Sequence, residues 1–217
     1  ADHEAIMVSR NRLKQFENSS FLVNSYFSKV SEIAHELNFV PVHGALLDLG
    51  LSSLQLDFEE RGFSFSDNNI LDMRFGLSND LTAKKIVNEY PEIEISNIIY
   101  QFSQDPNSRI IAKAIFNNRP FNNSKQLADL ISSIKLKVRR KHHPATLTFQ
   151  ALRMAVNDEV KELNKVLSDS FSLLGVGGRL AVISYHSTED KIVKNFINEG
   201  SSTCECPPLN LECNCNI

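Results

Sequence analysis

One short apolar run, Gly44-Ala-Leu-Leu-Asp-Leu-Gly-Leu-Ser-Ser-Leu-Gln-Leu-Asp57, ends abruptly in polar residues. A second run of the same form stands far along the chain, at Gly177-Gly-Arg-Leu-Ala-Val-Ile-Ser-Tyr-His-Ser-Thr-Glu-Asp190. A strand buried on both faces has this continuous apolar pattern, and ligands bind beyond the carboxyl ends of such strands in open α/β sheets. The two runs therefore predict two strands whose polar tips meet at one edge of a sheet.

The bulk composition is that of a soluble globular protein. The chain has 217 residues, of which 42% are hydrophobic and 23% charged, which suits one large or two small domains. No stretch approaches the roughly 18 apolar residues of a membrane span, and no secretory leader is visible, so we expect a cytoplasmic protein. The net charge of −3 disfavours a protein that is basic all over, so any nucleic-acid binding must come from a local patch.

The order of expected elements indicates a parallel sheet that is interrupted by helices. A helix over 4–16, a short strand over 20–25, a helix over 27–37 and a strand over 44–49 form the alternation of a βαβ unit. No strand is expected between 57 and 133. The pattern there predicts helices at 82–89, 93–102, 109–116 and 124–134, the last with Ser124 as its N-cap. One long helix over 148–171 then leads to a third strand at 179–184. The fold class is therefore α/β with a helical insertion.

A basic stretch, Lys135-Leu-Lys-Val-Arg-Arg-Lys141, is the clearest candidate for contact with nucleic acid. Five of its seven residues are cations, and His142 and His143 follow it. Neutralisation of phosphates by such a patch dominates affinity and makes it depend on salt. The alternative is a solvated helix end, where lysine and arginine are favourable in any case.

Four cysteines lie near the end of the sequence, as Cys204-x-Cys206 and Cys213-x-Cys215. Four thiolates can hold zinc in a tetrahedron, but this spacing is tighter than the usual gap of two to four residues. Free thiols or a disordered tail remain the alternative, and we assign no metal.

Several motifs in this order together resemble the RsmH (MraW) family of ribosomal RNA methyltransferases. They are Leu46-Leu-Asp-Leu-Gly-Leu-Ser-Ser-x-Gln-Leu-Asp57, Glu60-Arg-Gly-Phe-Ser-Phe65, Leu71-Asp-Met-Arg74, Asn118-Arg-Pro-Phe121, His143-Pro-Ala-Thr-x-Thr-Phe-Gln-Ala-Leu-Arg153, and His186-Ser-x-Glu-Asp190. The resemblance covers essentially the whole chain. Two departures are Phe102-Ser-Gln-Asp105, where the family has Tyr-Gly-Glu-Glu, and Thr188 in place of a leucine.

The resemblance implies methylation of cytosine N4 in 16S rRNA of the small ribosomal subunit, with S-adenosylmethionine as cofactor. It implies a Rossmann-like class I methyltransferase sheet, over 1–57 and 145–217, and a helical insertion over 58–144 that recognises RNA. The family's glycine-rich loop, the first acid of its Asp-x-Asp pair and its closing strands have no counterpart, so we expect a fragment with an incomplete sheet. A homodimer is possible, and no membrane association is expected.

The resemblance implies cofactor contacts, and the chemistry of methyl transfer and of phosphate binding indicates further candidate residues. The expected cofactor contacts are Asp2, Phe27 beside the adenine, Asp48 and Gln55. Acceptors for the cytosine amino hydrogens are expected among Asp48, Ser52 and Ser53, and His186 or Asp190 could take the released proton, although bulk water could as well. The expected RNA contacts are Arg61 and His143 together with the basic stretch, namely Lys135, Lys137, Arg139, Arg140 and Lys141.

Each of these residues also has a purely structural interpretation. Asp48 could satisfy neighbouring amides, the serines could belong to a turn, and His186 could be a structural histidine at a strand end. Glu189 and Asp190 could only cap the following helix, because acids favour a helix N-terminus. Phe27 could be part of an ordinary core.

Two other functions remain open beside the methyltransferase interpretation. The chain could fail to bind cofactor and act only as an RNA-binding or structural piece. It could also methylate a different acceptor, such as a small molecule or another nucleotide.

Overall fold

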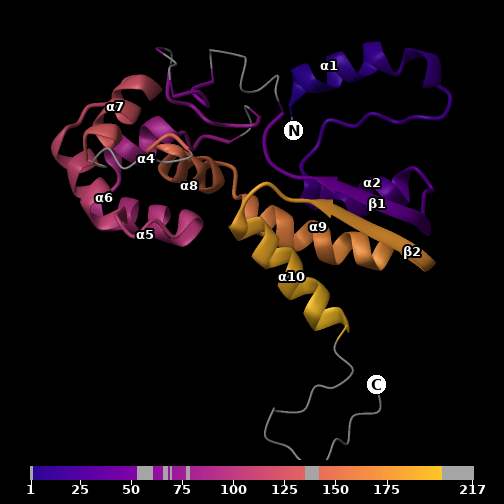
Figure 1. Cartoon of the computed structure of the whole chain (residues 1–217). Coiled ribbons are helices and arrows are strands. Elements are labelled where there is room, and N and C mark those ends of the chain that lie inside the picture. Colours follow the sequence, from indigo (N-terminus) through magenta and orange to yellow (C-terminus); the bar gives the residue numbers. More distant parts are fainter. Residues whose placement is uncertain are drawn as a thin grey trace, which may run out of the picture. The chain divides into compact units, whose positions relative to one another are not determined.

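The computed structural model describes residues 2–52, 61–65, 68, 70–76, 79–134 and 142–201. Within these ranges the chain forms two parallel strands and a larger set of helices (Figure 1). In order they are α1 (His3–Arg12), η1 (Lys14–Phe16), η2 (Phe27–Lys29), α2 (Val30–Glu36), β1 (Val42–Asp48), α4 (Ala83–Glu89), α5 (Glu92–Ser103), α6 (Ser108–Asn117), α7 (Ser124–Ile134), α8 (Thr146–Val156), α9 (Glu159–Leu173), β2 (Leu174–Ile183) and α10 (Ser187–Ser201).

The chain divides into two compact units. The helical unit comprises Ala1–Lys29 and Leu51–Glu162, and the sheet unit comprises Val30–Gly50 and Leu163–Ile217. The division by contacts does not address which segments bind cofactor and which bind RNA, so the domain assignment made from the sequence stays a prediction.

The two apolar runs pair as adjacent parallel strands, as the sequence predicts. β1 lies beside β2 with Leu47 opposite Val182 and Asp48 opposite Ile183. The ladder extends one step past the strand end, where the Leu49 N–H donates to the Ile183 carbonyl at 3.1 Å. Both strands therefore end at the same edge of the sheet.

Among the described residues of the sheet unit, the apolar packing lies on one face of the sheet. Side chains alternate between the faces of a strand, so Leu47 and Val182 share a face. That face packs with Leu167 of α9 and with residues of α10 in one apolar cluster. The opposite face carries Leu46, which is 66% exposed. Asp48 has the same parity as Leu46 and stands on this less covered face.

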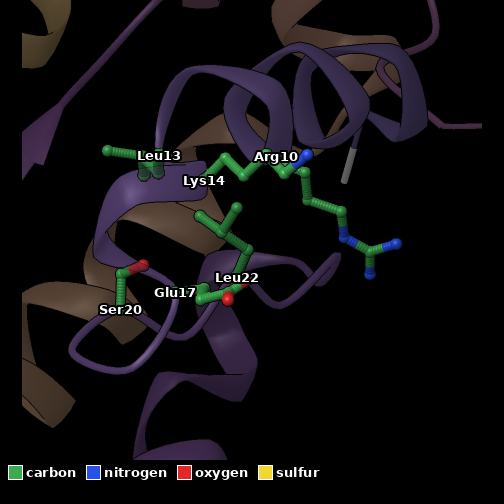
Figure 2. A pocket seen from close by; sticks show the side chains of 6 residues that line it. All are labelled: Arg10, Leu13, Lys14, Glu17, Ser20 and Leu22. Carbon is green, nitrogen blue, oxygen red and sulfur yellow. The ribbon is translucent and has the colours of Figure 1, made fainter.

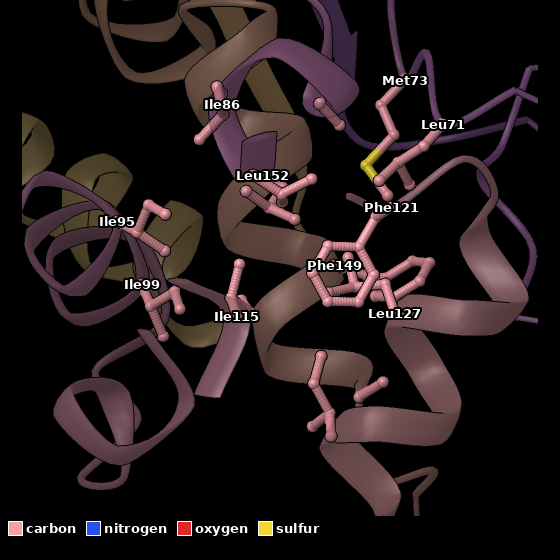
Figure 3. Close-up of a cluster of buried hydrophobic side chains, with 14 of the residues drawn as sticks. Leu71, Met73, Ile86, Ile95, Ile99, Ile115, Phe121, Leu127, Phe149 and Leu152 are labelled. Atoms are coloured by element: carbon pink, nitrogen blue, oxygen red, sulfur yellow. The ribbon is translucent and has the colours of Figure 1, made fainter. Parts of the chain in front are cut away.

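The core of the helical unit is a second, larger apolar cluster (Figure 3). It buries side chains from α4 to α8 and from the segment before α4, among them Leu71, Met73, Ile86, Ile95, Ile99, Ile115, Phe121, Leu127, Phe149 and Leu152. The buried positions recur at helical spacing, as in Ile111, Ala112 and Ile115 of α6. The helices predicted in this part of the sequence are confirmed to within a residue or two.

Three local predictions are wrong. Residues 20–25 are not a strand, and Phe21 and Val23 there are exposed. The helix expected over 148–171 is two helices, α8 and α9, because Asp158 between them has a left-handed φ of 50°. Ser124 is not an accepting N-cap, because its hydroxyl donates to the Gly62 carbonyl. The Asn123 side chain instead accepts from the Gln126 N–H at 2.9 Å.

None of the described helices combines the length and the apolar character that crossing a membrane requires.

Candidate functional site

Asp48 and Tyr185 meet at the shared edge of the two strands. The Tyr185 hydroxyl donates to the Asp48 carboxylate at 3.0 Å. Asp48 is the last residue of β1, and Tyr185 comes two residues after the end of β2. The polar tips of the two strands are thus joined by a direct hydrogen bond within the sheet unit.

Gly50 allows this approach, because it turns the chain away directly after β1. Its φ of 85° lies in the left-handed region, where a Cβ is unfavourable. A Cβ on Gly50 would also lie 3.2 Å from the Tyr185 ring. Glycine at this position therefore lets the backbone turn tightly beside the tyrosine ring.

The carboxylate changes the titration of the tyrosine. The hydrogen bond to Asp48, followed by the negative charge of Asp48, raises the pKa of Tyr185 above its ordinary value. The phenol consequently stays protonated and keeps donating over the whole neutral range. The tyrosine ring is 66% exposed, so the pair faces solvent and is accessible to a ligand.

His186 and Glu189 are both engaged at the start of α10. The His186 Nδ1 accepts from the Glu189 N–H at 3.4 Å, and the ring Nε2 lies 3.1 Å from the Glu189 carboxylate. The same carboxylate accepts from the Tyr185 N–H at 3.0 Å. These bonds satisfy amides at a helix N-terminus in the manner of a capping box, and they hold the histidine ring in one orientation.

Asp190, the other predicted proton acceptor, lies on the outside of α10. Its carboxylate is exposed and lies 2.8 Å from the Lys194 ammonium one turn later. Unlike Glu189, its carboxylate accepts no hydrogen bond from a described backbone N–H at the helix start, and it stays accessible to solvent.

Asp2 and Arg61 form an ion pair within the helical unit. The Arg61 guanidinium lies 2.9 Å from the Asp2 carboxylate, and both side chains are largely buried. Asp2 also caps α1 by accepting from the Glu4 N–H at 3.0 Å. The sequence assigned these residues separately to cofactor and RNA, and the structure places them against each other. Both assignments stay predictions.

Phe27, the residue expected beside adenine, opens η2 and is 44% exposed. The next residue is fixed by a hydrogen bond from the Ser28 N–H to the Glu162 carboxylate at 2.8 Å. The aromatic ring is therefore carried on an anchored turn and is not part of a core.

His143 stacks on Phe65 in the helical unit. The ring centroids are 4.4 Å apart and the planes differ by 14°. The His143 Nδ1 accepts from the Ala145 N–H at 3.2 Å, which fixes the ring just before α8. Phe65 in turn meets Phe149 edge to face. The ring is thus held by the fold, and its predicted contact with RNA stays a prediction.

Hydrogen bonds from the Asn157 side chain hold the segment that carries the Leu71-Asp-Met-Arg74 motif. The buried Asn157 side chain accepts from the Phe75 N–H at 2.7 Å and donates to the Met73 carbonyl at 2.7 Å. Burial alone would raise the pKa of Asp72, but the hydrogen bonds and charge of Arg74 outweigh it and lower that pKa. The Met73 N–H donates to the Arg61 carbonyl at 2.8 Å, so this segment also holds the backbone of Arg61.

The remaining predicted site residues divide into two groups. Ser52 is described and exposed. Ser53, Gln55 and the basic stretch lie outside the described residues, as do the four cysteines. Their predicted roles therefore stay predictions.

Tyr185 is the residue that reasoning from the sequence missed. Its signal was present, because it directly follows the strand predicted over 179–184, where polar groups collect. The sequence pattern alone could not show that its hydroxyl reaches the neighbouring strand end.

Comparisons with known proteins identify the family. The family model described as "MraW methylase family" matches residues 1–216. The chain is 47% identical over 219 residues to the "Ribosomal RNA small subunit methyltransferase H" of Dehalococcoides mccartyi. The matched region covers 100% of this chain and 62% of that relative. Proteins with the same name from Caldicellulosiruptor saccharolyticus and Heliobacterium mobile are 41% and 42% identical, over 95% and 99% of this chain and 68% and 70% of their own lengths.

The chain thus spans about three fifths of the Dehalococcoides relative, 62% of its length. The resemblance noted from the sequence motifs is confirmed, as is the α/β fold class with parallel strands. The match of a whole-family model to nearly every residue, together with these identities, shows that the chain belongs to the MraW methylase family.

Proposed function

We propose that this protein transfers a methyl group from S-adenosylmethionine to the N4 amino group of a cytidine in 16S rRNA of the small ribosomal subunit. Family membership supports this proposal, as do relatives that are named as small-subunit rRNA methyltransferases. The single observation in the structure that supports it most is the hydrogen bond between Asp48 and Tyr185 at the common edge of β1 and β2. In open α/β sheets this edge is where ligands bind.

The chemistry of the available side chains fits the cofactor in part. The exposed Asp48 carboxylate can accept hydrogen bonds from an ammonium or hydroxyl group, and the exposed Phe27 offers a face for adenine. Asp2 fits less well as the structure stands, because its carboxylate already binds Arg61 and the first amides of α1. When bound, S-adenosylmethionine supplies an electrophilic methyl group on a positively charged sulfur.

Positioning is what the protein itself must contribute. Cytosine N4 is a weak nucleophile because its lone pair is delocalised into the ring. Acceptors held against its hydrogens favour a more reactive geometry, and correct alignment alone can lower a barrier by about 7–11 kcal/mol. Tyr185 holds the Asp48 carboxylate in one orientation, which is the pre-organisation that such alignment requires. We assign Tyr185 as a positioning residue for Asp48.

The structure supports Asp190 over His186 as an acceptor for the released proton. The only lone pair of the neutral His186 ring lies at Nδ1 and already faces the Glu189 N–H. The exposed Asp190 carboxylate keeps acceptor capacity beside its contact with Lys194. We therefore propose that His186 orders the start of α10, while Asp190 or solvent takes the proton.

RNA recognition is proposed for residues 58–144, and cofactor binding for 1–57 and 145–217. The basic stretch over 135–141 would neutralise phosphates, and Arg61 and His143 would be further RNA contacts. A cytoplasmic location and a possible homodimer belong to the same proposal.

Methylation of isolated small ribosomal subunits tests the reaction. The protein is incubated with subunits and S-adenosylmethionine carrying a labelled methyl group, and the product is mapped by mass spectrometry of RNA fragments. We expect label on the N4 position of a single cytidine. Label on any other atom or on a small molecule would contradict the proposed acceptor. Binding of RNA without any transfer would favour the alternative of an RNA-binding piece.

A further inference from the structure

A run of exposed cations lies where α1 passes into η1. Arg10, Arg12 and Lys14 are all exposed, and none of them forms an ion pair with a described residue. Arg10 and Arg12 lie in the last turn of α1, where the helix dipole favours positive charge. That preference accounts for cations at this end of the helix, but it does not account for the cavity beside them.

The cavity has a volume of about 280 Å³ and lies beside Arg10 and Lys14 (Figure 2). It is lined by Arg10, Leu13, Lys14, Glu17, Ser20 and Leu22. In Figure 2 the side chains of Arg10 and Lys14 extend along one side, and Leu22 points from the following segment toward the helix. Sites for drug-sized ligands have about 300–1,000 Å³, so this cavity suits one small unit such as a nucleotide.

Two exposed aromatic rings belong to the same segment. Phe16 is 50% exposed and precedes Glu17, and Phe21 is 57% exposed and stands between Ser20 and Leu22. Cations that follow a phosphate backbone, together with exposed aromatic rings on which bases stack, are the pattern of single-strand binding. Stacking of this kind does not depend on base sequence, because every base has a π-face.

We propose that this cavity and its flanking residues bind a nucleotide of single-stranded RNA. Arg10 and Lys14 contact phosphates, Leu13 and Leu22 form the apolar wall, and Phe16 or Phe21 stacks on an adjacent base. The Glu17 carboxylate accepts a hydrogen bond from a ribose hydroxyl or a base amino group, whereas it would repel a free anion or an anionic lipid surface. The inference rests on the proposed function, since it names a second contact for the same RNA outside residues 135–141.

The test is RNA binding by matched pairs of charge-removing variants. Binding of the whole chain to a labelled single-stranded RNA is measured by fluorescence polarisation over a range of salt concentrations. The double variant R10Q/K14Q removes two cations spaced four residues apart on one helix. The control K161Q/K165Q removes two exposed cations with the same spacing from α9, outside the residues proposed for RNA recognition.

Loss of two phosphate contacts has a calculable effect. Each contact to a single strand contributes about 0.7 to the slope of log K against log salt, so R10Q/K14Q should flatten the slope by about 1.4. At about 0.1 M salt this corresponds to about 25-fold weaker binding. The control should stay within about twofold of the wild type and keep its slope. Phe16→Leu with Phe21→Leu should weaken binding about fivefold or more without changing the slope.

Three results would overturn the inference. They are an unchanged slope in R10Q/K14Q, an equal loss in the control, and no RNA binding by the wild-type chain. Binding to vesicles of anionic phospholipid that depends on Arg10 and Lys14, while RNA binding does not, would assign the patch to a lipid surface instead. Calorimetric titration with S-adenosylmethionine separates this inference from the proposed function. R10Q/K14Q should keep the cofactor affinity of the wild type. If the wild-type chain did not bind S-adenosylmethionine, only the proposed function would be contradicted.

Discussion

The Asn157 side chain holds the segment over 71–76 by hydrogen bonds, and replacing it by alanine tests how much these bonds contribute to stability. Its side chain satisfies the Phe75 N–H and the Met73 carbonyl, both at 2.7 Å. The Asn157→Ala variant leaves these two backbone groups without their partner. An unsatisfied buried polar group costs about 1–3 kcal/mol, so the free energy of unfolding of the helical unit should fall by about 3 kcal/mol. The Arg153 carbonyl still accepts the backbone N–H of residue 157 and adds little to the loss.

Urea denaturation and hydrogen exchange of the Phe75 amide measure the effect. The matched control is Asn118→Ala, because the Asn118 side chain is exposed and donates to the Ala114 carbonyl at 2.8 Å. The control should change stability by no more than about 0.5 kcal/mol. Equal losses in the two variants, or a loss of less than about 1 kcal/mol in Asn157→Ala, would refute the role of the buried amide.

Three further outcomes are expected. The pKa of Tyr185 lies above the ordinary value of about 10, so the neutral phenol contributes stability that is complete below that value and is lost as the pH rises through the raised pKa. Asp48→Asn should lower this pKa toward the ordinary value, as measured by a spectrophotometric difference titration against Tyr185→Phe. An unchanged titration would contradict the pairing. Gly62→Ala places a Cβ 2.5 Å from the Ile70 carbonyl at a φ of 73° and should cost about 2–4 kcal/mol in thermal unfolding, whereas Gly200→Ala in open space should be neutral or slightly stabilising. Neutralising Arg139, Arg140 and Lys141 should weaken RNA binding and flatten its dependence on salt. An unaltered slope of log K against log salt would instead favour the interpretation of these residues as solvated surface.

The sequence predicted best the elements whose pattern is set by burial. The apolar runs of β1 and β2 follow from packing against the core of the sheet unit, and the spacing of buried residues in α5, α6 and α7 follows from packing in the core of the helical unit. The strand expected over 20–25 failed because apolar residues alone do not make a strand. A strand also needs a partner for its backbone hydrogen bonds, and no described strand lies beside it.

The site was predicted less completely, because its contacts join residues far apart in the sequence. The placement of Asp48 at a strand end followed from the local pattern, but its partner Tyr185 is separated from it by 137 residues. The pairing of Asp2 with Arg61 was hidden for the same reason, since each residue alone suggested a ligand contact. The break between α8 and α9 depends on one left-handed residue, Asp158, which a helical pattern of apolar residues does not reveal.

Cofactor binding measures the role of the joined strand tips most directly. The wild-type chain, Asp48→Asn and Tyr185→Phe are titrated with S-adenosylmethionine by isothermal calorimetry, and circular dichroism confirms that each variant is folded. A hydrogen bond to a charged group is worth about 1.5–3 kcal/mol, so we predict saturable binding by the wild type and at least about tenfold weaker binding by Asp48→Asn. Tyr185→Phe should fall between the two. Wild-type affinity in Asp48→Asn, or no binding by the folded wild-type chain, would contradict the account.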